Sequence, residues 1–165
     1  MAGLVAGAVG TWAMTRMQSG MSAASKAWQD EAEAEAEAHR PLSREQPSEP
    51  ATAKAADMAM RTVGGRYLTE REKARVAPLV HYAFGTLMGG VYGLLAEVVP
   101  SVTTGGGTGF GTALFIGADE VAVPALGLSG TPGEMPASSH AFGLASHLGY
   151  GLVVELVRRN VRDVM

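Results

Sequence analysis

The feature that most constrains the fold is a glycine repeated every fourth residue in an apolar segment. His81, Gly85, Gly89, Gly93 and Glu97 fall four residues apart, and residues at this spacing share one face of a helix. Glycine costs about 1 kcal/mol relative to alanine inside a soluble helix, so three on one face need a structural reason. The bare backbone they leave lets a second helix approach closely, as in membrane helices.

The same ridge recurs 58 residues later, as Ser139, Gly143, His147, Gly151 and Glu155. Residues 81–99 and 139–157 also share identities beyond the ridge, among them the pairs Phe84/Phe142 and Tyr92/Tyr150. We interpret the two stretches as an internal repeat. The repeat predicts a glycine-zipper type of packing, with these helix-packing positions: Gly85, Gly89, Gly93, Gly143 and Gly151.

Four Gly- and Ala-rich apolar blocks define the expected fold class. They cover residues 1–17, 76–100, 105–130 and 137–157. This pattern predicts an all-α polytopic membrane protein in which four transmembrane helices form two repeated helical hairpins. Three transmembrane helices plus a re-entrant segment at 121–136 are the alternative, because that segment is apolar but broken by prolines and glycines.

The charge distribution predicts how such a chain is oriented. Ten Lys and Arg lie between Arg16 and Arg75, and three follow the last block. By the positive-inside rule, the polar insert 18–75 is therefore cytosolic, within a single membrane domain of residues 1–165. With four crossings, both termini lie on the opposite side.

Local signals place the remaining elements. The first helix, 2–17, is expected to continue through the Glu-Ala tract, and the Pro-rich stretch His39–Thr52 is a linker. A short helix is expected at 53–63, ended by two glycines. Thr69 and Glu72 form a capping box, so the next helix begins at Glu70 and runs to about Val98. The third span covers 105 to about 118 and is aligned with the first by pairing Gly10 with Gly111.

Five ionisable residues are the candidates for chemistry. On this topology, four of them lie at one depth near the cytosolic face: His81, Asp119, Glu120 and His140. The fifth, His147, replaces a ridge glycine and is the deepest, with no carboxylate expected at its level. Buried ionisable groups in membrane proteins are paired and often mark proton sites, and histidine titrates between pH 5 and 8. A hydrogen-bonded clamp, a proton site and a metal site all remain open for this cluster.

Composition excludes several other classes. The chain has no cysteine, so disulfides and thiolate chemistry are absent. Its net charge of −3 gives no support for a nucleic-acid partner. The sequence carries no pattern of catalytic residues and predicts no cofactor. The expected partners are the lipid bilayer and either other membrane helices or a second copy of the chain.

Several segments resemble the YagU-like family of bacterial inner-membrane proteins of unknown function, also called domain of unknown function 1440. The resemblance rests on AGLVAGAVGTWAM, on HYAFG, on DEVAVPALGLS and on the paired histidines of SSHAFGLASHLGYG. The Glu-Ala tract and the Pro-rich linker are not part of it. The resemblance implies a multi-pass protein of the bacterial inner membrane and a loose link to acid tolerance, and it supplies no catalytic residues.

Three functional hypotheses follow for the chain. The first is a non-enzymatic membrane protein that responds to protonation and aids acid resistance or envelope homeostasis. The second is a structural or assembly subunit that packs against other membrane helices. The third is a metal-binding membrane enzyme that uses the same cluster. A soluble helical protein is the alternative outside the membrane class.

Overall fold

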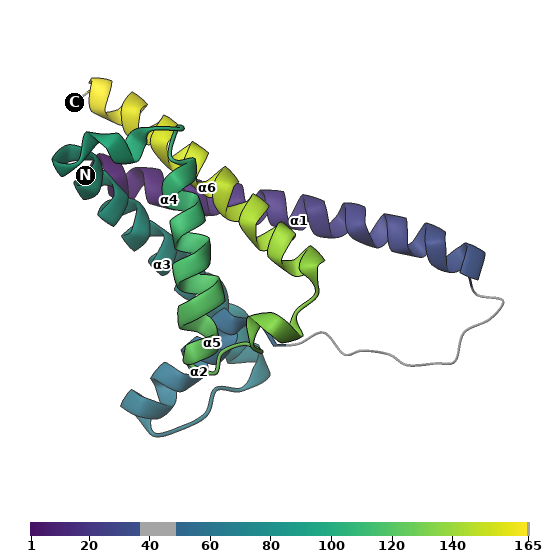
Figure 1. Cartoon of the computed structure of the whole chain (residues 1–165). Coiled ribbons are helices and arrows are strands. Elements are labelled where there is room, and N and C mark those ends of the chain that lie inside the picture. Colours follow the sequence, from purple (N-terminus) through teal and green to yellow (C-terminus); the bar gives the residue numbers. More distant parts are fainter. Residues whose placement is uncertain (37–48, 165) are drawn as a thin grey trace.

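The computed structural model describes residues 1–36 and 49–164, and every regular element in these two ranges is a helix (Figure 1). The expected all-α class is therefore confirmed for the described part of the chain. The elements are α1 (Ala2–Ala36), α2 (Ala51–Gly64), α3 (Glu70–Val98), the 3-10 helix η1 (Pro100–Thr103), α4 (Thr108–Leu114), the π-helix η2 (Phe115–Ala122), α5 (Val123–Ala125), the 3-10 helix η3 (Pro132–Glu134) and α6 (Ala137–Val164).

The predicted start and end of α3 are confirmed. The Thr69 hydroxyl accepts a hydrogen bond from the Glu72 amide at 3.3 Å, and the Glu72 carboxylate accepts one from the Thr69 amide at 2.8 Å. Such a reciprocal pair satisfies amides that the first turn of a helix leaves free. The helix ends at Val98, and η1 begins at Pro100.

The two elements before α3 also agree with the sequence. α1 continues without a break from the first apolar block to Ala36, as expected. α2 begins two residues earlier than predicted and ends at Gly64, followed by Gly65 in the left-handed region, with φ 63°. The predicted linker falls largely on residues 37–48, which lie outside the described residues.

The prediction for the third block is wrong at both ends. α4 begins at Thr108, and the helix does not stop near residue 118 but continues through η2 and α5 to Ala125. Residues 121–125, expected in a loop or re-entrant turn, are thus helical. Pro124 lies close to the end of this continuous helix, which runs only one residue beyond it, to Ala125.

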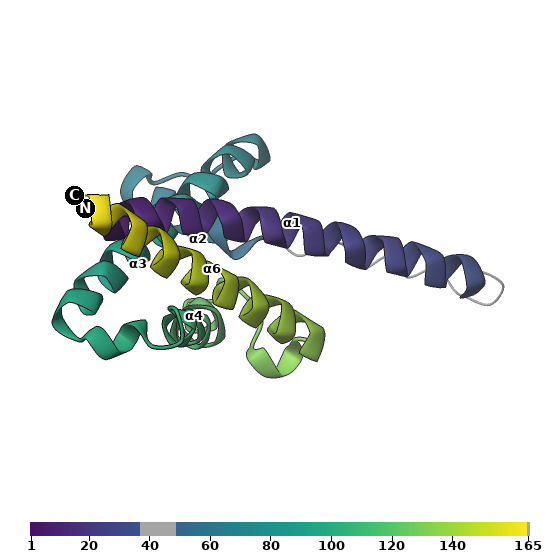
Figure 2. The ribbon, with the colours of Figure 1, turned by 90° about the horizontal axis from the view of Figure 1, so that it is seen from above.

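α1 is the central helix of the bundle, since it makes the most extensive contacts with the other helices. α3 and α6 both pack along its N-terminal half, and α4 packs on α6 (Figures 1 and 2). α1 then extends beyond the bundle as a single helix. The N-terminus of α1 and the C-terminus of α6 lie at the same end of the molecule in both views.

The glycines of α3 face the glycines of α1 at backbone contact. A Cβ added to Gly3 would lie 2.6 Å from the Gly89 carbonyl oxygen, and one on Gly7 would lie 2.7 Å from that of Gly85. A Cβ on Gly89 would overlap the backbone of Gly7. Neither helix could carry even alanine here without moving, which is the structural reason for the ridge.

The second pair of helices, α4 and α6, meets in the same way. A Cβ on Gly111 would overlap the His147 carbonyl, and one on Gly151 would overlap that of Gly107. Thr11 fills the space against Gly85, and Phe115 fills it against Gly143. The contacts therefore equate α1 with α4 in this register: Gly3 with Gly107, Gly7 with Gly111, and Thr11 with Phe115. The sequence pairing of Gly10 with Gly111 is wrong by three residues.

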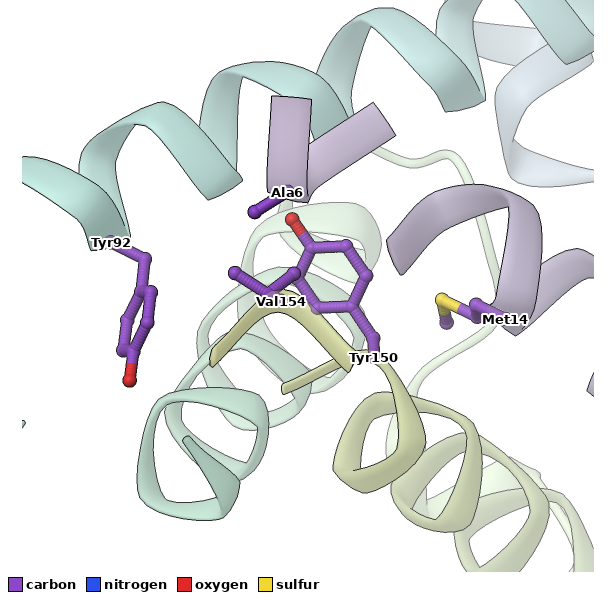
Figure 3. Packing of buried hydrophobic residues seen from close by; sticks show 5 residues of the cluster. All are labelled: Ala6, Met14, Tyr92, Tyr150 and Val154. Carbon is purple, nitrogen blue, oxygen red and sulfur yellow. The ribbon is translucent and has the colours of Figure 1, made fainter. Parts of the chain in front are cut away.

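The centre of the bundle is small and mixed in character. Its apolar cluster consists of five side chains from α1, α3 and α6, shown in Figure 3: Ala6, Met14, Tyr92, Tyr150 and Val154. Polar or charged residues are buried beside them: Thr11, Ser146, His147, Glu155 and Arg158. Large apolar side chains lie outside instead, among them Leu94 at 71 % and Leu79 at 66 % exposure. The described bundle thus buries small and polar groups and exposes apolar ones.

Within the described residues, one helix, α3, is both long and apolar enough to cross a membrane. The expected count of four spans is not established by length and composition.

Candidate functional site

The five candidate residues form two groups at the end of the bundle away from the chain termini. One group pairs Glu120 of η2 with His140 in the first turn of α6. The other brings together Asp119 of η2, His147 of α6 and His81 of α3. The side chains of the first group are half-buried. In the second, deeper group the His147 side chain is 7 % exposed, whereas the Asp119 side chain is 45 % exposed.

His140 is held at both ring nitrogens. Its Nδ1 lies 2.7 Å from the Glu120 carboxylate, and its Nε2 lies 3.0 Å from the Pro132 carbonyl oxygen. A carbonyl and an ionised carboxylate can only accept, whereas a neutral imidazole donates from one nitrogen. The arrangement therefore holds one proton more than neutral histidine and ionised glutamate.

His147 lies deeper and has a carboxylate near it, contrary to the sequence expectation. Its Nδ1 donates to the Gly143 carbonyl oxygen at 2.9 Å and lies 3.7 Å from the Asp119 carboxylate. Side chains on a helix lean toward its N-terminus. In the antiparallel pair of η2 and α6 this lean moves Asp119 and His147 toward each other. Judged from the positions of their Cα atoms along the helices, the two residues lie at different levels. The sequence therefore predicted no carboxylate near His147.

His81 completes the deeper group without a hydrogen bond of its own at Nε2. That nitrogen is buried and has no hydrogen-bond partner among the described residues. The ring lies close enough to His147 and Asp119 for their charges to act on it. The expected neighbourhood of His81 with Asp119 is therefore present, but its neighbour on α6 is His147 and not His140.

The described residues contain no group of three or more His, Asp and Glu placed to hold a metal ion. His140 and His147 each use Nδ1 for a protein oxygen. The geometry supports proton exchange at these positions more directly than coordination.

A second polar cluster, which the sequence did not predict as a site, lies at the opposite end of the bundle. Glu155 is 2 % exposed and accepts hydrogen bonds from Tyr92 at 2.9 Å and from Arg158 at 2.7 and 3.0 Å. Arg159 also pairs with Glu155, and Arg162 pairs with Glu97 at 3.0 Å. The signal available in the sequence was the repeat itself, which places a Tyr and a Glu at matching positions on both helices.

The fold and these two clusters define an all-helical bundle with glycine-mediated helix contacts and buried charge. A family model described as protein of unknown function (DUF1440) matches residues 39–156. The chain belongs to this family. The match includes all five candidate residues, and it also includes the Pro-rich linker, which the sequence resemblance left out. It does not extend over residues 1–38, to which the resemblance assigned one segment.

Two further comparisons give no match: neither a curated protein nor a solved structure is similar enough to be counted. The narrower YagU-like assignment stays a prediction.

Proposed function

We propose that the chain is a multi-pass protein of the bacterial inner membrane, without enzymatic activity, whose histidine–carboxylate groups respond to pH and serve acid tolerance or envelope homeostasis. Four helical segments would cross the bilayer: the N-terminal part of α1, the apolar part of α3, α4 with η2, and α6. The insert 18–75 would be cytosolic.

Support for the membrane comes from the distribution of side chains. Soluble proteins expose few large contiguous apolar patches, whereas here exposed apolar residues follow α1, α3 and α6: Leu4, Val5, Trp12, Leu87, Leu94, Val98, Leu152 and Leu156. Three ionisable residues, His147, Glu155 and Arg158, are buried in the bundle, as expected where the surroundings are lipid. Both termini at one end of the bundle fit an even number of crossings.

Support for a pH response comes from the His140 pair, the observation that carries this proposal. Glu120 faces His140 from η2, and η3 presents to it the Pro132 carbonyl. When the shared proton leaves, one of the two hydrogen bonds must be lost, because only one ring nitrogen can then donate. The contact that joins α6 to η2 and η3 is therefore complete in acid and loosened at higher pH.

The test uses the absence of native cysteines. A single reporter, Gly133→Cys, is placed in η3, where an added Cβ meets no atom within 4 Å. A second single variant, Gly20→Cys on α1, is an equally open reference. In proteoliposomes, we expect the ratio of the two maleimide-labelling rates to rise several-fold between about pH 5 and 8. The ratio cancels the titration of the thiol itself.

The matched variant is His140→Gln, whose side chain hydrogen-bonds but does not titrate. We expect its labelling ratio to be constant over the same pH range. A constant ratio in the wild type, or an equal rise in the variant, would contradict a pH-responsive contact. The second hypothesis, a structural or assembly subunit whose exposed apolar helix faces pack against other membrane helices, would then be the better account.

A further inference from the structure

The end of the bundle opposite the histidines carries an apolar groove with a buried arginine at its inner end. The groove has a volume of about 340 Å³, within the range of ligand pockets. Its apolar walls come from α1 and α3 and include Leu4, Leu87, Gly90, Val91 and Leu94. The charged side chains that line it are Arg158 of α6 and Glu97 of α3.

Arg158 has one guanidinium nitrogen that the protein leaves unused. Nε and Nη2 both donate to Glu155, whereas the buried Nη1 has no hydrogen-bond partner among the described residues. The Glu97 carboxylate lies 3.7 Å from Nη1, beyond hydrogen-bond distance, and Glu97 already accepts from Arg162. A buried unpaired donor is costly, and a guanidinium edge is suited to a phosphate or carboxylate oxygen.

The charges around Arg158 leave room for one anion. Three arginines, Arg158, Arg159 and Arg162, meet two glutamates, Glu97 and Glu155. The cluster has one positive charge in excess, and a phosphodiester carries one negative charge. An apolar groove that leads to this charge matches an acyl chain joined to such a head group.

We propose that the groove binds an anionic phospholipid, with its phosphate at Arg158 Nη1 and one acyl chain between α1 and α3. Glu97 is 55 % exposed at its side chain and turns outward to admit the phosphate. The inference rests on the proposed membrane location, because it takes the lipid from the surrounding bilayer.

The experiment measures lipid retained by the purified full-length chain in detergent. The probe is phosphatidylglycerol, whose only head-group charge is its phosphodiester, and the number of bound molecules is counted by native mass spectrometry. We expect one retained phosphatidylglycerol per chain, at least five-fold more than phosphatidylcholine or oleate at equal concentration. Equal retention of all three, or retention of oleate alone, would overturn the proposal.

Three variants locate the site without removing Arg158, whose loss could unfold the chain by leaving Glu155 unpaired. Leu94→Trp fills the groove and should reduce phosphatidylglycerol retention at least five-fold, whereas Leu156→Trp, on the exposed face of α6 outside the groove, should not change it. Glu97→Gln removes the competing carboxylate and should raise retention severalfold. Equal retention by the two Trp variants, or a loss in Glu97→Gln, would contradict the site. A chain that inserts into membranes yet retains no phosphatidylglycerol would refute this site and leave the proposed function standing.

Discussion

At Gly89 the missing side chain is what allows α1 and α3 to touch. An added Cβ would overlap the backbone of Gly7, and backbone atoms cannot turn aside as a side chain can. The only relief is to separate the two helices, which would also part Gly3 from Gly93 and disturb the buried Tyr150 hydroxyl, which donates to the Gly85 carbonyl at 2.5 Å. A single added methyl group at Gly89 would therefore disturb the whole contact between α1 and α3.

We expect Gly89→Ala to lower the free energy of unfolding by about 1–3 kcal/mol, as overpacking of a tight contact does. The control is Gly109→Ala on α4, where an added Cβ meets no atom within 4 Å, so that stability should be unchanged or slightly higher. The measurement is thermal or denaturant unfolding in detergent micelles. Equal stability of the two variants would show that the α1–α3 contact tolerates a side chain.

The direction in which a side chain extends from its helix decides which ionisable groups meet. His147 and Asp119 meet because both side chains lean toward the N-terminus of their own helix. The sequence shows which residues share a ridge, so the two groups of histidines and carboxylates could be expected at one end of the bundle. It does not show the direction of each side chain, and hence it did not predict that Asp119 lies near His147.

Among the elements, the junction of α2 and α3 has the clearest dependence on pH. It lies in the charged first turns of α3, before Pro78 and outside the apolar part of the helix. Hydrogen bonds from the Arg66 guanidinium and from Thr69 lower the pKa of Glu72 to about 2. The contribution of Glu72 to stability is therefore complete above its ordinary pKa, and it is lost as pH falls from there toward 2.

We expect the Thr69 amide to stay protected from hydrogen exchange at neutral and mildly acidic pH and to lose protection only below about pH 4, as Glu72 becomes protonated. Glu72→Gln removes the titration while keeping an oxygen that can accept from Thr69. Its protection should be weaker at neutral pH and should not change as acid is added. A wild-type midpoint near the ordinary glutamate pKa would contradict the assigned bonds.

The same comparison of elements shows what local sequence can predict. α3 was predictable at both ends because its signals are local: a capping box, an apolar run and Pro100. The third block was not, because Pro124 and the nearby glycines suggest a break soon after residue 118, whereas the helix continues to Ala125. The π-helix η2 likewise has no local signature in the sequence. The buried Tyr92–Glu155–Arg158 cluster depends on how α6 crosses α3, which only tertiary packing decides.

For the whole molecule, the distribution of polarity is the central observation. Among the described residues, eleven apolar residues are buried as core, and several of them are alanines, whereas about twice as many large apolar side chains are exposed. In water such a bundle would leave its apolar faces solvated and would pay to dehydrate Glu155 and Arg158. In a bilayer the same faces meet acyl chains, and the buried charges are paired within the protein. We infer that lipid is the solvent for which this fold is organised.

The most direct test of this account is fractionation of cells that express the full chain. Membranes are collected without detergent, washed with alkaline carbonate to strip peripheral proteins, and then dissolved in a mild detergent. We predict that the chain stays in the membrane pellet through the carbonate wash and is released only by detergent. Recovery of folded chain in the first soluble fraction, or its release by carbonate, would contradict an integral membrane bundle.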